Sequence, residues 1–332
     1  MADENPFAHL IASLGWQRQR VENLIRRWMI FRGARGTVSW RWPWPFQKPW
    51  QRARLRLCSH GGGIGDELMC TPIFREIRRL NPRCHITFLS RHQDVFERNP
   101  HLSAVERFTP AAAANAIYLQ YNLVLPPPRP LVTLMAECVG LNLSASHLEP
   151  PIIDPSGSIQ ARIAEVPEPR ILIQPQASRW TPNKQWPFAS WTRLVEMLVE
   201  RYHVIEVGTQ SMFPQQQFGP RFHSFAGETT MQDFIWMISQ AAVFVGPVSG
   251  GMHIANAYKI PSVVLFGGYE APDGFDYPFA HRFFTPVDCA PCWLTTPCPF
   301  ELKCLHAIHP DAVSRAVVRA VETNASRKLA EA

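Results

Sequence analysis

No run of eighteen or more apolar residues occurs in this 332-residue sequence, so the sequence predicts no membrane-spanning helix. A secretory signal is also missing, because residues 1–9 carry acidic groups where such a signal carries basic ones. Both absences indicate a cytoplasmic protein. At 46% apolar residues, the chain is long enough for two domains that each bury a core.

Excess positive charge is absent from most of the chain, although the formal net charge is +6. Residues 1–56 hold eleven Lys or Arg and three Asp or Glu, whereas the remainder holds 22 basic and 24 acidic residues. The body of the chain is therefore not basic, which argues against nucleic acid as its partner.

Residues 1–53 form a basic, tryptophan-rich extension. A helical spacing of apolar residues runs from Pro6 to Arg32, and prolines prevent a regular helix in the segment Ser39–Phe46. An amphipathic helix with Trp and Arg is typical of a segment that lies on an anionic membrane surface. Packing of the extension on the body is the alternative, and contact with nucleic acid is a third.

From residue 54 the pattern alternates between strands and helices, as in parallel sheets. Two such series, at 54–150 and 171–332, predict an α/β protein of two Rossmann-like, doubly wound domains that face a cleft. A proline-rich linker at 151–170 separates them. The expected strands are 55–59, 85–90, 104–108, 121–125, 171–174, 204–208, 243–245 and 262–266, and the expected helices are 67–80, 131–140, 191–202, 231–241, 251–259 and 311–326.

An anion site is predicted where a buried strand runs into Ser249-Gly250-Gly251 and then into a helix. Ser249 can cap that helix, and the glycines allow a ligand to approach the main chain closely. The N–H groups and the helix dipole attract a phosphate. Many α/β proteins place Ser-Gly at such a turn for geometry alone, so the motif by itself leaves both interpretations open.

A glycine loop, Gly61-Gly-Gly-Ile-Gly-Asp66, follows the first strand. Its glycines, Gly63 and Gly65 among them, let a ligand approach the main chain. An acid at position 66 would repel a pyrophosphate, so Asp66 is a candidate general base that takes a proton from an acceptor hydroxyl. The alternative is that Asp66 is the N-cap of the following helix.

A polar loop follows the first strand of the second series. Its Ser178, Arg179 and Lys184 offer hydrogen-bond donors and positive charge that suit a departing diphosphate. A solvated loop is the alternative. His253 lies inside the helix that follows the turn Ser249-Gly250-Gly251. It is a candidate ligand contact, although a histidine there more often makes a local hydrogen bond.

Four of the eight cysteines are clustered as Cys289-x2-Cys292-x5-Cys298-x5-Cys304. The first spacing is that of a thiolate metal knuckle, and four such ligands would satisfy a structural zinc or iron ion. Free thiols and disulfides are the two alternatives.

The order of these motifs resembles the bacterial heptosyltransferases of glycosyltransferase family 9, which add ADP-heptose to lipopolysaccharide. The resemblance rests on Gly65-Asp66 followed by Thr71-Pro72, on Lys184-Gln-Trp-Pro187, and on Ser249-Gly-Gly-Met-His-Ile-Ala255. It covers the chain from residue 54 to the C-terminal helix. Three motifs in one order are far more specific than any one of them.

The resemblance implies a GT-B fold in which residues 54–150 face the acceptor and residues 171–332 bind the nucleotide sugar. It implies Asp66 as catalytic base, Lys184 as a donor-phosphate ligand that assists departure, and Thr229 in the nucleoside pocket. Ser249, Gly250 and Gly251 would cradle the diphosphate. No cofactor is required for catalysis in that family.

One position departs from the family pattern, because Val248 stands where the family has an acid before the Ser-Gly. Either the donor differs from ADP-heptose, or another acid compensates, or the activity is weakened or lost. The function expected is inverting transfer of heptose or a related sugar from a nucleotide diphosphate to a lipopolysaccharide or other cell-surface glycan, at the inner face of the inner membrane. A sugar-nucleotide epimerase and a degenerate, non-catalytic nucleotide-sugar-binding protein are the alternatives.

Overall fold

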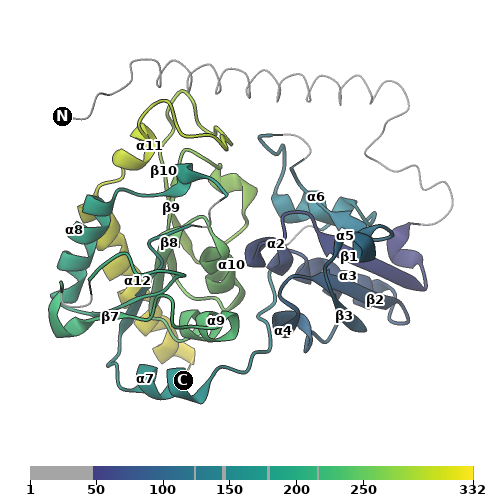
Figure 1. Ribbon diagram of the computed structural model, residues 1–332, viewed down its shortest axis with the longest axis horizontal. Helices are drawn as coiled ribbons and strands as arrows, with labels where there is room; N and C mark the ends of the chain where they lie inside the picture. The colour runs from purple at the N-terminus through teal and green to yellow at the C-terminus, as the bar shows by residue number, and fades with distance from the viewer. Residues whose placement is uncertain (1–47, 123–124, 144–146, 178–179, 215–216, 332) are drawn as a thin grey trace.

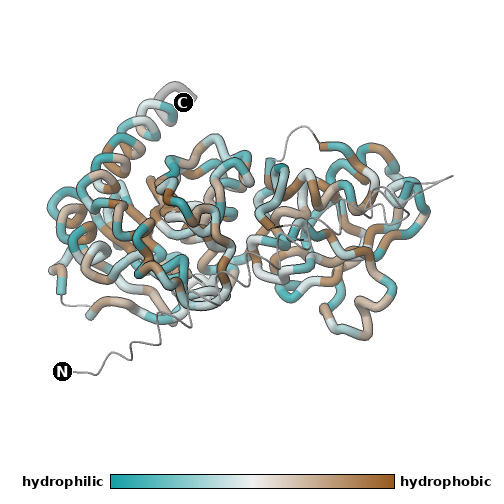
Figure 2. The backbone as a smooth tube through the Cα atoms, turned by 90° about the horizontal axis from the view of Figure 1, so that it is seen from above, coloured by the Kyte–Doolittle hydropathy of each residue, from teal (hydrophilic) through white to brown (hydrophobic). Residues whose placement is uncertain are grey.

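The computed structural model describes residues 48–122, 125–143, 147–177, 180–214 and 217–331. The extension at 1–47, with its expected membrane contact, lies outside these residues, as do Ser178 and Arg179. Within the part that is described, no helix has both the length and the apolar character needed to cross a membrane. Two lobes, one for each predicted series, lie side by side (Figures 1 and 2).

The first lobe is built on a four-stranded parallel sheet with the order β3-β2-β1-β4. Strand β1 is central, and Leu57 pairs with Ile117 of β4. The sheet order reverses between β1 and β4, so their carboxyl ends form the switch point where such folds bind ligands. The elements are η1 (Pro49–Gln51), β1 (Arg54–Ser59), α2 (Ile64–Leu68), α3 (Thr71–Leu80), β2 (His85–Ser90), α4 (Gln93–Phe96), β3 (Ala104–Arg107), α5 (Pro110–Ala113), β4 (Ile117–Leu119) and α6 (Leu131–Glu137).

The second lobe is built on a six-stranded parallel sheet with the order β10-β9-β8-β5-β6-β7. Here the order reverses between β5 and β8, whose carboxyl ends form a second switch point. The elements are β5 (Arg170–Ile173), η2 (Pro182–Lys184), α8 (Phe188–Val199), β6 (His203–Glu206), η3 (Gly219–Arg221), β7 (Phe222–Ser224), α9 (Met231–Ser239), β8 (Val243–Pro247), α10 (Gly250–Ala257), β9 (Ser262–Gly267), η4 (Pro272–Gly274), β10 (Ala280–Phe284), α11 (Lys303–His306) and α12 (Pro310–Glu331).

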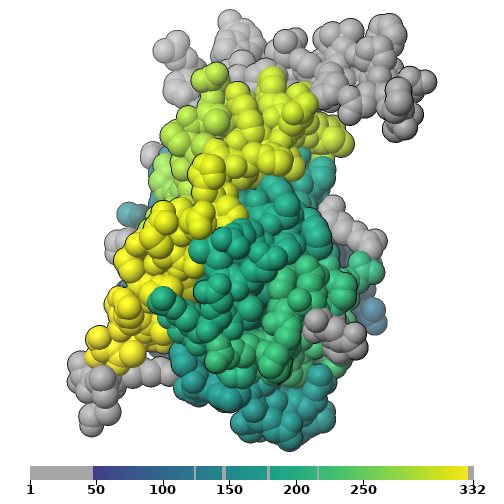
Figure 3. Space-filling model, turned by 90° about the vertical axis from the view of Figure 1, so that its left-hand side faces the viewer, coloured from purple at the N-terminus to yellow at the C-terminus, as the bar shows by residue number. Residues whose placement is uncertain are grey.

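Alternation along β5 shows that both faces of the second sheet are covered. Ile171 and Ile173 belong to one core cluster, which includes Trp191 of α8 and Val313 of α12. Leu172 belongs to another, which includes Met252 of α10. Helices α8 and α12 lie side by side on the outer face (Figure 3). This two-sided burial is the doubly wound arrangement that the sequence predicts.

Three expectations about secondary structure are wrong. The helix expected at 67–80 is two helices, α2 and α3, that break at Met69 and Cys70. The strand expected at 121–125 is instead β4, which lies four residues earlier and leaves Tyr121 in the loop after it. The proline-rich segment 151–170 is not a plain linker, because it contains helix α7 (Gly157–Ala164).

Helix α7 is fixed to the second lobe by hydrogen bonds at both of its ends. The Ser156 main-chain N–H donates to Asp233 Oδ1 at 2.7 Å, and Arg162 Nη1 donates to Glu228 Oε2 at 2.6 Å. Ile159 and Ile163 are buried in the core. The connection between the lobes therefore packs as part of the fold.

Candidate active site

The catalytic candidate Asp66 lies in the first turn of α2, directly beyond the switch point of the first sheet. Its carboxylate accepts a hydrogen bond from the Gly63 main-chain N–H at 3.2 Å and one from the Tyr121 hydroxyl at 2.8 Å. Tyr121 follows β4, so the carboxyl ends of β1 and β4 together hold this carboxylate. The N-cap residue of α2 is Gly63, so Asp66 is not the N-cap itself, but from the third helical position its carboxylate accepts the hydrogen bond of the N-cap N–H and so helps to cap the helix.

Glycines around Asp66 make room for its carboxylate. A Cβ atom on Gly61 would lie 2.2 Å from Asp66 Oδ2, and one on Gly63 would lie 3.2 Å from it. Gly62 has a φ of +68°, which glycine adopts without strain. The loop that was expected to admit a ligand thus serves first to place the side chain of Asp66.

Burial raises the pKa of Asp66 above its ordinary value. The hydrogen bonds from Tyr121 and Gly63 and the positive charge of Lys184 act in the opposite direction and favour the carboxylate. A base whose pKa is raised toward the working pH takes up a proton more readily than an exposed carboxylate does. The environment of Asp66 therefore suits a general base.

Lys184 lies in the second lobe, where it forms an ion pair with Glu270, an acid that the sequence analysis did not single out. Its Nζ lies 2.9 Å from Glu270 Oε1 and 4.7 Å from the centre of the Tyr269 ring. Tyr269 and Glu270 follow β9, so they also lie at the carboxyl edge of the sheet. A search for polar residues after each strand would have found Glu270. The positive charge of Lys184, which was expected to bind a phosphate, is thus paired with the carboxylate of Glu270.

Ser249 precedes α10 at the second switch point, but it does not cap the helix. Its hydroxyl donates to Gln174 Oε1 at 2.9 Å, and no side-chain cap is formed at α10. Gln174 follows β5, so this bond joins the ends of the two strands at the switch point. The predicted capping role of Ser249 is wrong, and its position at the turn is confirmed.

Helices α2 and α10 touch each other across the junction of the lobes through small residues. A Cβ atom on Gly65 would lie 2.4 Å from His253 Cδ2, and one on Gly250 would lie 2.5 Å from Ile64 Cγ2. A Cβ atom on Gly251 would lie 2.3 Å from Gln174 Oε1. The two sequence motifs therefore meet, and their glycines permit the contact.

His253 is a buried, neutral part of this contact. Its Nδ1 lies 2.6 Å from the Tyr277 hydroxyl oxygen, and burial together with the charge of Lys184 lowers its pKa to about 3. It carries no positive charge at neutral pH. His253 packs between the lobes and makes the local hydrogen bond that a histidine here was expected to make.

Of the two further predicted positions, one lies apart from this contact. Thr229 is half-buried in the loop between β7 and α9. Strand β7 is three positions from β8 in the sheet, about 15 Å at the usual spacing of strands. Val248, by contrast, directly precedes Ser249 at the turn. Its apolar side chain is 5% exposed and packs in the core, so this position supplies no carboxylate.

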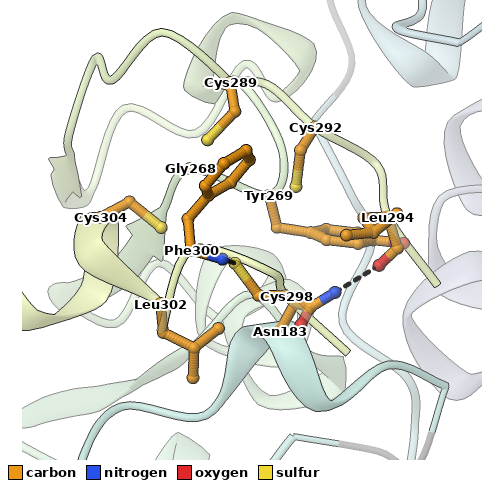
Figure 4. Close-up of a pocket in the computed structure, with 10 residues that line it drawn as sticks. All are labelled: Asn183, Gly268, Tyr269, Cys289, Cys292, Leu294, Cys298, Phe300, Leu302 and Cys304. Carbon is orange, nitrogen blue, oxygen red and sulfur yellow. Dashed lines mark hydrogen bonds between the residues drawn. The ribbon is translucent and has the colours of Figure 1, made fainter. Parts of the chain in front are cut away.

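The four clustered cysteines line one small cavity of about 10 Å³ (Figure 4). Cys292, Cys298 and Cys304 are free thiols, so within the described residues no disulfide joins the members of this cluster. Burial raises the pKa of Cys292 to about 12 and also raises that of Cys304. Among the described residues, no group of three or more His, Cys, Asp or Glu is arranged to hold a metal ion.

The loop that carries these cysteines braces the two segments that hold Lys184 and Glu270. The Asn183 side-chain amide donates to the carbonyl oxygens of Leu294 and Thr296 at 2.6 and 2.8 Å. The main-chain N–H groups of Cys292 and Trp293 donate to the carbonyl oxygens of Gly268 and Tyr269, at 3.0 and 3.1 Å. The cysteine loop thereby fixes the neighbours of both members of the ion pair.

Comparison with known proteins finds a family match over part of the chain. Residues 129–273 match the model of glycosyltransferase family 9 (heptosyltransferase). No curated protein shows significant sequence similarity to the chain.

Among solved structures, the ADP-heptose LPS heptosyltransferase II of E. coli is 16% identical, with a TM-score of 0.60 over 81% of this chain and 99% of that one. A family 9 glycosyl transferase of Veillonella parvula is 14% identical, with a TM-score of 0.60 over 81% and 97%. The dodecameric iron-containing heptosyltransferase TibC of enterotoxigenic E. coli, in complex with ADP-D-β-D-heptose, is 18% identical, with a TM-score of 0.60 over 82% and 78%. These likenesses confirm the GT-B fold.

Proposed function

We propose that this chain is a glycosyltransferase that moves heptose or a related sugar from a nucleotide diphosphate to a glycan hydroxyl. The match of residues 129–273 to the model of glycosyltransferase family 9 supports this proposal. The observation that carries this proposal is the meeting of the two switch points. There, helix α2, which carries Asp66, packs against α10 at the turn of Ser249, and Lys184 lies on the side of the second lobe, where its positive charge favours the carboxylate of Asp66. A base and a diphosphate ligand on opposite sides are the two groups that glycosyl transfer requires.

In the proposed reaction, Asp66 takes the proton of the acceptor hydroxyl while the acceptor oxygen attacks the anomeric carbon. The bond between that carbon and the diphosphate oxygen breaks, and the diphosphate leaves with the bonding electrons. Lys184 and the main chain at Ser249-Gly250-Gly251 offset the negative charge that grows on it. One displacement on one carbon inverts its configuration.

The donor is proposed to be ADP-heptose or another nucleotide diphosphate sugar, and the acceptor to be lipopolysaccharide or another cell-surface glycan. Two solved relatives of the same fold are described as ADP-heptose transferases or are bound to that donor. In the chain itself, the turn at Ser249 and the more distant Thr229 lie along one edge of one sheet. An elongated ligand with a phosphate at one end and a nucleoside at the other would follow such an edge.

A two-step assay tests the proposal. A thermal-shift screen of ADP, GDP, UDP, CMP and dTDP sugars finds the donor, because a ligand that binds only the folded state raises the melting temperature. Release of the nucleotide is then measured with and without lipooligosaccharide. Stimulation of release by the acceptor supports transfer. A protein that binds none of these sugars, or one that releases nucleotide at the same rate without acceptor, is not the proposed enzyme.

The extension is proposed to hold the enzyme, as a cytoplasmic protein, at the inner face of the inner membrane. Its tryptophans and its charge balance of eleven basic to three acidic residues over 1–56 support this proposal. In a flotation assay on anionic vesicles, deletion of residues 1–50 should abolish association. Association that survives the deletion removes this part of the proposal.

A structural zinc or iron ion is proposed for the cysteine cavity. Four sulfur ligands suit either metal, and TibC is described as iron-containing. The sulfurs would have to move together to ligate the ion, since their present arrangement holds none. Metal analysis of protein purified without chelator is the test. Less than roughly a tenth of an equivalent of zinc and iron contradicts it, because a structural site is expected to be filled.

A further inference from the structure

Glu270 has one carboxylate oxygen that the structure leaves unused. The residue is 6% exposed, and its Oε1 lies 2.9 Å from Lys184 Nζ. Within the part of the chain that is described, its buried Oε2 has no hydrogen-bond partner. A buried acceptor without a hydrogen-bond partner destabilises a protein, so its presence in a folded protein calls for a functional explanation.

The carboxylate of Glu270 lies close to the junction of the lobes. Burial raises the pKa of Glu270, Lys184 lowers it, and the negative charge of Asp66 adds a smaller increase. Burial also raises the pKa of Tyr121 and Tyr277, and the charges of Asp66 and Glu270 add to this. The geometry on either side is direct, because Tyr121 donates a hydrogen bond to Asp66 at 2.8 Å and Glu270 lies 2.9 Å from Lys184, whose charge favours the carboxylate of Asp66. Oε2 therefore belongs to the same carboxylate that pairs with Lys184, next to the place where we propose the diphosphate to lie.

The main chain holds Glu270 in place. Gly268 and Tyr269, directly before it, accept hydrogen bonds from the cysteine loop at 3.0 and 3.1 Å. The Tyr269 hydroxyl also accepts one from Trp180 Nε1 at 3.1 Å. With this bracing on one side and Lys184 on the other, the carboxylate is a preorganised acceptor.

Chemistry restricts what can satisfy Oε2. A phosphate offers only acceptors and negative charge, so a carboxylate repels it. The partner must donate a hydrogen bond and carry no negative charge, and among the groups that a sugar presents beside a diphosphate, hydroxyls meet both conditions. In a nucleotide diphosphate sugar whose diphosphate lies at Lys184, the transferred sugar carries hydroxyls directly beside the diphosphate.

We propose that Glu270 is the sugar-recognising residue of the site, with Oε1 holding Lys184 and Oε2 accepting a hydrogen bond from a hydroxyl of the transferred sugar. This inference rests on the proposed function, and it assigns a role that neither the sequence motifs nor the phosphate turn supply. In this role, Glu270 raises the affinity of the site for the intact nucleotide sugar and lowers its affinity for the nucleoside diphosphate alone.

The test compares two affinities in the same variant by isothermal titration calorimetry. The probes are ADP with ADP-heptose, GDP with GDP-mannose and UDP with UDP-glucose, and the pair that the wild-type protein binds is used. Glu270→Gln removes the charge and keeps the shape. Glu270→Asp keeps the charge and draws the oxygens back by one methylene, which serves if the first variant does not fold.

The expected result is a pair of shifts in opposite directions. In Glu270→Gln, affinity for the nucleotide sugar falls roughly tenfold through loss of a charge-assisted hydrogen bond, while affinity for the nucleoside diphosphate stays the same or rises. In Glu270→Asp, only the nucleotide sugar loses affinity. The matched control is Glu149→Gln. Glu149 is also ion-paired, at 3.0 Å from Arg75, but it lies in the first lobe, whereas Glu270 lies in the second. The control should change neither affinity.

Equal loss of both affinities would overturn the inference, because it would mean that Glu270 only maintains the fold or contacts the nucleoside. Unchanged affinities would overturn it as well. Either result leaves the proposed function intact. Failure of the wild-type protein to bind any of the six probes removes the proposed function itself, so the two failures are distinguishable.

Discussion

The two lobes place one charged group each at a switch point, but they hold that group in opposite ways. Asp66 of the first lobe receives hydrogen bonds from Tyr121 and Gly63, neither of which is charged. Lys184 of the second lobe is paired with a buried acid, Glu270. The first arrangement leaves a carboxylate able to gain and lose a proton. The second holds an ammonium in place through a buried carboxylate, so that its remaining N–H groups can bind a phosphate.

This difference predicts that the first lobe controls the rate of the chemical step and that the second controls nucleotide affinity. Changes at Asp66 should alter the chemical step and leave nucleotide binding nearly intact. Changes at Lys184 should alter binding and stability together, because one partner of a buried ion pair cannot be removed without exposing the other to an apolar environment.

The largest effect is expected from Asp66→Asn. The amide cannot take up the acceptor proton, so kcat should fall by about 10²- to 10⁴-fold, the usual contribution of a general base. Nucleotide affinity should stay within a few fold of the wild-type value. Steady-state kinetics and calorimetry on the same preparation measure both. Loss of nucleotide binding in this variant would show that Asp66 is structural and would remove the distinction between the lobes.

Lys184→Met should show the second largest effect, on two properties at once. Nucleotide affinity should fall by roughly 10- to 100-fold with the loss of a charged phosphate contact. The free energy of unfolding should also fall, by up to roughly 3–5 kcal/mol, because Glu270 is left buried without its partner. Denaturant titration and calorimetry measure the two.

The double variant Lys184→Met/Glu270→Gln separates these two causes. It should recover most of the lost stability and none of the lost affinity, since it removes the unpaired charge without restoring the ammonium. If the double variant is as unstable as Lys184→Met, the ion pair is not what couples stability to this site.

A smaller effect is expected where the lobes touch. A methyl group on Gly65 would lie 2.4 Å from the His253 ring, so Gly65→Ala should push α2 away from α10 and lower kcat/KM several-fold. Gly157→Ala is the matched control, because a Cβ atom at Gly157 in α7 meets nothing within 4 Å. The control should keep full activity and the same or slightly higher melting temperature. Equal activity in the two variants would mean that close contact of the lobes is not needed.

The smallest effect concerns pH. Burial raises the pKa of Asp66 above 3.8, so kcat/KM should decline as the pH falls through that raised pKa, where the base becomes protonated. The same burial affects stability with a definite sign. A raised pKa in the folded state stabilises the fold fully below 3.8, and this contribution is lost as the pH rises through the raised pKa.

Asp66→Asn therefore gains stability relative to the wild-type protein as the pH rises, and urea titrations at several pH values measure the difference between the two. A difference that does not change with pH would show that Asp66 keeps its ordinary pKa.

Much of this site was predictable because parallel α/β folds bring the carboxyl ends of their strands together. Asp66, Lys184 and the turn at Ser249 all follow predicted strands, and the structure gathers them where the two lobes meet. The break between α2 and α3 also had a signal that was missed, because Pro72 lies in the first turn of α3, a position that proline favours.

Two residues of the site were missed for physical reasons. Glu270 is 86 residues from Lys184 in the sequence and belongs to no motif, so only the tertiary contact reveals it. Tyr121 was assigned to a strand because β4 is only three residues long and gives little periodicity. The hydroxyl of Ser249 likewise donates its hydrogen bond to Gln174, which follows β5, and does not cap α10. The local sequence around Ser249 could not predict this partner.

The central claim is that one base from the first lobe drives a single displacement on a donor held by the second. The most direct test is the anomeric configuration of the sugar in the product, determined by NMR after transfer to the acceptor. We predict a configuration opposite to that of the donor, because Asp66 activates the acceptor hydroxyl for attack from the face opposite the diphosphate. A product that retains the donor's configuration would contradict it.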